Sequence, residues 1–188
     1  MKRGLALILA LVVVAGVAGA GLYWRWVNSP VYSLYHMVSA LKARNYDDFF
    51  NYLIIKDIMA GMVDASSKDL LLKGDPKEGD WAKFGRQLGQ KLASQFIPKL
   101  FEGFEKEMRA VVEAYLRQLT DQQIQALAEA VDLAEVQTQG DEAQVVLKEK
   151  KTGERLGLTM RRHPRDRVWR IVGLSYEDFK RIIKREFK

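Results

Sequence analysis

The side chains that could perform acid–base chemistry in this 188-residue chain are few. It has two histidines, His36 and His163, and no cysteine. His36 lies beside Tyr35 in a segment with helical spacing, where an imidazole facing a pocket could act as a general acid or base. A lone histidine is more often a structural or surface residue, and His163 is explained by the turn sequence His163-Pro-Arg-Asp166. His36 is therefore a weak catalytic candidate.

No catalytic or metal-binding motif accompanies this histidine. The sequence lacks His-Glu-x-x-His, Gly-x-Ser-x-Gly and a phosphate-binding glycine loop. Without cysteine it has no thiol nucleophile and no disulfide. Asp47 and Asp48 are adjacent, and acidic residues in the first turn of a helix explain them better than a shared substrate does. We therefore expect no metal and no cofactor, and an enzyme is the less favoured class of protein.

Basic residues are the more informative set. The chain has 30 Lys and Arg against 24 Asp and Glu, and from residue 144 onward it has 14 against 6. Alternating apolar and polar positions in this region predict one basic face of a sheet. Four cations are the candidate ligand-binding residues of that face: Lys148, Lys150, Arg155 and Arg161.

This basic face could bind anionic lipid, a wall polymer or an acidic envelope protein. It could equally be a solvated face that keeps the domain soluble. Nucleic acid is not an expected partner, because aromatic side chains do not interleave with these cations as a stacking platform requires.

Four short strands must position the basic face. The hydrophobic period changes from helical to alternating after the region of residue 132, which predicts strands at 133–139, 143–150, 155–162 and 167–174. The short turn sequences between them predict an antiparallel meander. Its apolar face must be covered by the preceding helices.

Helices are predicted before and after the strands in the sequence. Ser29-Pro30 begins a helix that continues to about residue 44, and Asn45 begins another that continues to about residue 62. An apolar stripe interrupted by Pro98 predicts helices near 80–96 and 98–118.

Two capping sequences define the remaining helices. Thr120-Asp-Gln-Gln123 is a capping box that opens a short helix to about Ala130. Ser175-Tyr-Glu-Asp178 opens a final helix, basic and amphipathic, which we expect to pack on the domain rather than lie on a membrane surface.

The N-terminal stretch determines where this domain lies. Residues 4–24 contain no charged residue, and a helix of that length rises about 31 Å, which matches the hydrocarbon thickness of a bilayer. Lys2 and Arg3 precede it, so the positive-inside rule predicts an inside N-terminus and an extracytoplasmic domain. Tyr23-Trp24-Arg25-Trp26 has the pattern of an interfacial aromatic belt.

A cleaved signal peptide is the alternative, with Ala18-Gly19-Ala20 as its cleavage site. Both alternatives export the domain. The predicted organisation is a single-pass membrane anchor or signal peptide at residues 1–28, followed by one α+β domain at residues 29–188.

Several short segments resemble one bacterial family. They are Ser29-Pro-Val-Tyr-Ser-Leu34, Ala40, the stretch from Asp47 to Leu53, Gly89-Gln-Lys-Leu-Ala-Ser-Gln-Phe-Ile-Pro98 and Trp169-Arg-Ile-Val172. Together they are similar to membrane-anchored proteins of unknown function whose domain has the cystatin-like cone of the nuclear-transport-factor-two-like superfamily. The resemblance implies that helices pack on a curved meander around a pocket. It implies no activity, and fold alone does not supply one.

The leading interpretation is a non-enzymatic, membrane-anchored extracytoplasmic binding domain. Its ligand would be an apolar molecule or lipid in the pocket, or an anionic envelope surface on the basic face. Two alternatives remain open: a small acid–base enzyme of the cone fold that uses His36, and an assembly subunit that pairs with another envelope protein.

Overall fold

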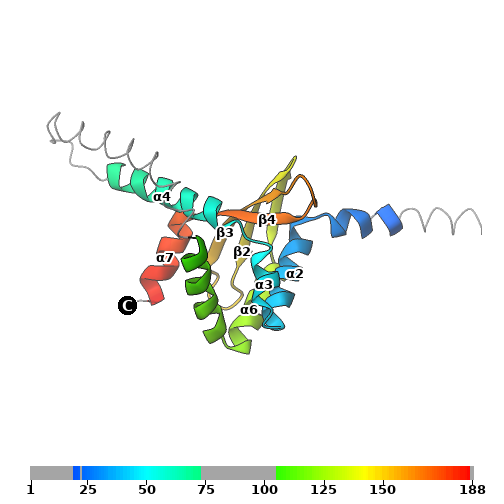
Figure 1. Cartoon of the computed structure of the whole chain (residues 1–188), viewed down its shortest axis with the longest axis horizontal. Coiled ribbons are helices and arrows are strands. Elements are labelled where there is room, and N and C mark those ends of the chain that lie inside the picture. Colours follow the sequence, from blue (N-terminus) through cyan, green and yellow to red (C-terminus); the bar gives the residue numbers. More distant parts are fainter. Residues whose placement is uncertain (1–18, 22, 73–104, 187–188) are drawn as a thin grey trace, which may run out of the picture.

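The computed structural model describes residues 19–21, 23–72 and 105–186 (Figure 1). Most of the predicted anchor, the predicted helix at 80–96 and the beginning of the one at 98–118 lie outside these residues. No helix in the described part of the chain combines the length and the apolar character that crossing a membrane requires. Residues 105–118 are helical, in agreement with the prediction for that stretch.

The described residues form an α+β fold with one four-stranded antiparallel sheet, as predicted. The strands β1 (Glu135–Gln139), β2 (Glu142–Lys148), β3 (Arg155–Arg162) and β4 (Trp169–Leu174) lie side by side in chain order. The predicted and observed bounds of β3 are the same. The strand β4 begins later than predicted, because residues 163–168 form the loop between β3 and β4.

The apolar face of the sheet is buried under helices. Register places Ala143 opposite Met160 and Val145 opposite Leu158, so the inward positions of β2 and β3 line up. The helices α2 (Pro30–Lys42), α3 (Tyr46–Phe50) and α6 (Asp121–Asp132) share one core with these residues and are grouped together in Figure 1. The predicted apolar face and its helical cover are confirmed.

The predicted caps explain where two of these helices begin. The hydroxyl of Ser29 accepts a hydrogen bond from the backbone N–H of Tyr32 at 3.2 Å, and Pro30 occupies the first turn. Thr120 and Gln123 form the predicted reciprocal capping box at the start of α6.

The prediction of one helix from Asn45 to about residue 62 is wrong. After α3 the chain leaves the helix and pairs with β4: the Ile171 N–H donates to the Tyr52 carbonyl at 2.8 Å, and the Ile54 N–H donates to the Ile171 carbonyl at 2.9 Å. The helix α4 (Ile55–Leu72) begins only after this bridge. Hydrogen bonds to the edge of a sheet have overridden a continuous helical periodicity.

The final helix, α7 (Tyr176–Glu186), packs on the domain as predicted. Its Asp178 carboxylate accepts a hydrogen bond from the Gly157 N–H at 3.0 Å, beyond the last paired residue of β4. Arg181 donates to the Arg155 carbonyl at 3.1 Å. A side chain at Gly157 would lie 3.1 Å from the Ser175 Cβ, so the small residue permits this close approach.

Docking of α7 is expected to weaken in acid. Burial opposes the charge of Asp178, but hydrogen bonds from Gly157, Ser175 and Arg181 outweigh it and hold the pKa of Asp178 below its usual range. A lowered pKa stabilises the fold fully above the unfolded value of about 3.9 and ceases to do so as the pH falls through the folded value. The amide resonance of Gly157 should therefore titrate at acidic pH. In Asp178→Asn it should not, and an unchanged wild-type resonance would contradict the contact.

Candidate functional site

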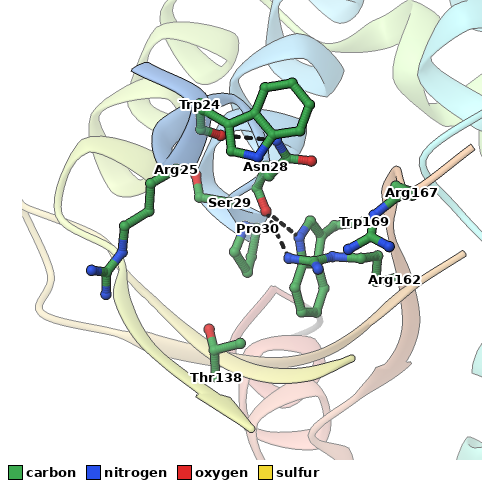
Figure 2. Close-up of a pocket in the computed structure, with 9 residues that line it drawn as sticks. All are labelled: Trp24, Arg25, Asn28, Ser29, Pro30, Thr138, Arg162, Arg167 and Trp169. Atoms are coloured by element: carbon green, nitrogen blue, oxygen red, sulfur yellow. Dashed lines mark hydrogen bonds between the residues drawn. The ribbon is translucent and has the colours of Figure 1, made fainter. Parts of the chain in front are cut away.

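A cleft of about 510 Å³ lies where the N-terminal helical segment meets the domain (Figure 2). Its walls come from the end of that segment, the start of α2, the strand β1 and the β3–β4 hairpin. We call it the arginine cleft, and it is lined by Trp24, Arg25, Asn28, Ser29, Pro30, Thr138, Arg162, Arg167 and Trp169.

The backbone carbonyl of Asn28 fixes one wall of the arginine cleft. It accepts a hydrogen bond from the Trp169 indole at 2.7 Å and another from the Arg162 guanidinium at 3.1 Å, both drawn in Figure 2. The Asn28 side chain donates to the Trp24 carbonyl at 2.8 Å, which caps the end of the N-terminal segment. The segment before α2 is thus tied directly to the sheet.

Trp169 is the buried centre of this junction. It is 1% exposed, and its backbone N–H donates to the hydroxyl of buried Ser33 at 3.3 Å. Both N–H groups of Trp169 therefore have hydrogen-bond partners, as buried polar groups require. The indole lies beneath Arg162, whose guanidinium is 4.7 Å from the ring centroid.

Arg162 is held in place by several groups. Its side chain is 19% exposed and lies 3.7 Å from the Asp141 carboxylate. Its Nε is buried and has no hydrogen-bond partner among the described residues. The charge of Arg162 is thus fixed by stacking and by the Asn28 carbonyl, and is only partly balanced by Asp141.

Arg25 and Arg167 are the less constrained cations. Both are exposed, and neither has an acidic partner within the described part of the chain. The backbone of Arg167 is left-handed, with φ of 59°, and its N–H donates to the His163 carbonyl at 2.9 Å to close the loop. Glycine adopts this conformation without steric penalty, whereas arginine does not. Loop geometry therefore does not account for an arginine here.

The nearest loop carboxylate is already occupied. Asp166 accepts hydrogen bonds from the Val168 N–H at 3.0 Å and from Arg170. Burial opposes its charge, but these hydrogen bonds outweigh it, so the pKa of Asp166 lies below its usual range. Asp166 is thus an anion engaged with the loop and with Arg170, and it makes no ion pair with Arg167 in the described part of the chain.

The arrangement suits an oxyanion. Guanidinium groups donate in a planar fork that matches phosphate and carboxylate, and they are more weakly hydrated than ammonium groups. Trp24, 73% exposed, adds an apolar surface to the lining of the cleft. The arginine cleft can therefore bind a negatively charged group that also carries apolar surface.

The four sequence-predicted cations do not form one site. Register places Lys148 opposite Arg155 at one end of the β2–β3 pair, and Lys150 lies in the adjoining turn. Arg161 lies about 20 Å further along β3. It is 3.4 Å from the carboxylates of both Asp57 and Glu142. Ligand binding by these residues remains a prediction, with three of them grouped and Arg161 neutralised elsewhere.

His36 lies on the exposed side of α2. Its ring packs edge-to-face on Tyr32 at 4.4 Å, in an open groove with Trp26, Tyr35 and Ser39. Those described lining residues include no carboxylate to act with His36. The hydroxyl of Tyr35 donates a hydrogen bond to Asp132. This hydrogen bond is the main reason that the pKa of Tyr35 is raised. The groove offers a stacked aromatic surface rather than an acid–base pair.

Sequence reasoning missed Arg162, Arg167 and Trp169 as site residues. A signal was present, because arginines are dense on both sides of the His163–Asp166 turn. What the sequence could not show is that Trp24 and Arg25 return to this turn from the other end of the chain.

Comparisons with protein-family models, with curated proteins and with solved structures gave no match to this chain. Among the described residues, no three or more His, Asp and Glu side chains gather as a metal site would require. The geometry of the arginine cleft is therefore the basis for a functional conclusion.

Proposed function

We propose that this chain is a membrane-anchored extracytoplasmic domain that binds an anionic group in the arginine cleft. One observation carries the proposal: Arg25, Arg162 and Arg167 line one cleft, and Arg25 and Arg167 have no acidic partner among the described residues. Trp24, the last residue of the uncharged stretch at residues 4–24, lines the cleft. An anchor ending at Trp24 would hold it at the membrane surface.

The proposed site lies away from the basic sheet face, but the ligand it would bind is of the same kind, an anion. On the sheet face, Arg161 is paired with two carboxylates. In the arginine cleft, Arg162 is preorganised by Trp169 and Asn28, so less side-chain entropy is lost when it binds. Helices covering one face of a meander are also compatible with the cystatin-like cone and the membrane-anchored family proposed from the sequence.

The binding test uses the full chain in a neutral detergent and inorganic phosphate as the probe. Arg25→Gln combined with Arg167→Gly should weaken phosphate binding at least tenfold in calorimetry, because each charge-assisted hydrogen bond contributes about 1.5–3 kcal/mol. Glycine suits the backbone at position 167, so folding should be retained. Arg165→Gln, in the same loop but outside the cleft lining, is the matched control and should bind as wild type.

Lys148→Gln combined with Lys150→Gln tests the competing sheet face. If this pair abolishes binding and the cleft pair does not, the site lies on the sheet. If wild type binds no phosphate, the proposed anion site is wrong.

The absence of cysteine gives a direct test of topology. A single cysteine at Lys151→Cys, in the exposed β2–β3 turn, should react with a membrane-impermeant maleimide on intact cells. Lys2→Cys should react only after the cells are permeabilised. The reverse pattern would contradict export of the domain.

A further inference from the structure

The cations of the arginine cleft lie on two sides of it. Figure 2 shows Arg25 extending from the N-terminal segment on one side, and Arg162 and Arg167 on the other, with Ser29 and Pro30 between them. A single small oxyanion bound by Arg162 and Arg167 would leave Arg25 without a partner. The arrangement suits a ligand with two negative groups.

The size and setting of the cleft narrow the ligand further. A volume of about 510 Å³ exceeds what one inorganic phosphate needs and falls in the range typical of small-molecule sites. Trp24 lies at the cleft and also ends the uncharged stretch at residues 4–24.

We infer that the arginine cleft binds the headgroup of a membrane lipid carrying two phosphate groups, one bound by Arg162 and Arg167 and the other by Arg25. This inference rests on the proposed function. The chemistry required is two phosphates on one molecule, which either a lipid or a soluble diphosphate can supply. The uncharged stretch that ends at Trp24 favours the lipid, because an anchor there would hold the site at the bilayer surface.

The test compares four probes on the full chain in neutral detergent. Cardiolipin and phosphatidylglycerol, with two and one phosphates, are compared by native mass spectrometry, and inorganic pyrophosphate and phosphate by calorimetry. Wild type should prefer the two-phosphate member of each pair about tenfold, since one further charge-assisted contact forms. Cardiolipin should bind more tightly than pyrophosphate.

Single variants test which wall of the cleft binds which phosphate. Arg25→Gln should lower cardiolipin affinity about tenfold and change phosphatidylglycerol affinity less than threefold, because one phosphate can still occupy the opposite wall. Arg167→Gly should lower both affinities. Arg165→Gln should change neither, and circular dichroism of each variant would confirm that it is folded.

The outcomes separate this inference from the proposed function. Phosphate binding without a two-phosphate preference, or a preference that survives Arg25→Gln, overturns the inference and leaves the anion cleft standing. Pyrophosphate binding as tightly as cardiolipin overturns the lipid as the source. If wild type binds none of the four anionic probes, the inference and the proposed function are both overturned.

Discussion

Trp169→Ala is expected to lower the free energy of unfolding by about 3–5 kcal/mol, the range for truncating a buried aromatic residue. The side chain is 1% exposed, and its removal leaves a cavity beneath Arg162. It also leaves the Asn28 carbonyl without the shorter of its two hydrogen bonds. Urea unfolding of the full chain, followed by circular dichroism, measures the loss.

Three variants separate the causes of the stability loss expected for Trp169→Ala. Trp24→Ala removes an exposed indole from the same cleft and should change stability by less than about 0.5 kcal/mol. Trp169→Phe keeps most of the packing and removes the indole N–H. Ser33→Ala leaves the Trp169 backbone N–H unpaired at the cost of about 1–3 kcal/mol. Equal effects of Trp24→Ala and Trp169→Ala would contradict the junction described above.

Arg162→Glu is expected to destabilise the fold by about 2–4 kcal/mol and to abolish anion binding. The new carboxylate would face the Asn28 carbonyl oxygen and the Asp141 carboxylate, both of which now interact with the guanidinium. It would also lie over the negative face of the Trp169 ring. Unfolding and phosphate titrations of the same preparation measure the two effects.

Arg162→Met separates the two effects. It keeps an unbranched apolar stem over Trp169 without an opposing charge, so it should lose less stability than Arg162→Glu while still losing phosphate affinity. Wild-type affinity in a folded Arg162→Met protein would remove Arg162 from the site. Wild-type stability in Arg162→Glu would contradict its enclosed position.

Local signals in the sequence predicted most of the described fold. Ser29-Pro30 and Thr120–Gln123 fix helix starts through hydrogen bonds within one turn. Alternation predicts β3, because each inward residue meets a partner at the same level of β2. The break after α3 was not predicted, since it depends on hydrogen bonds to Ile171, more than a hundred residues away.

The four cations predicted from the sequence as ligand-binding residues are not the residues that line the arginine cleft. Lys148 and Arg155 share one end of the sheet, as alternation indicates, but the pairing of Arg161 with Asp57 depends on where α4 begins. The arginine cleft depends on contacts between the two ends of the chain. Neither periodicity nor spacing records the approach of Asn28 to Trp169.

The hydrogen bonds from Trp169 and Arg162 to the Asn28 carbonyl also limit the reach of the domain. A domain on a flexible tether samples a volume set by the length of its linker. Here the segment before α2 is hydrogen-bonded to the sheet, so the described residues contain no flexible linker between that segment and the domain. If residues 4–24 span the bilayer and the arginine cleft binds an anion as proposed, this bonded junction would let the domain select its ligand by depth in the membrane interface as well as by charge.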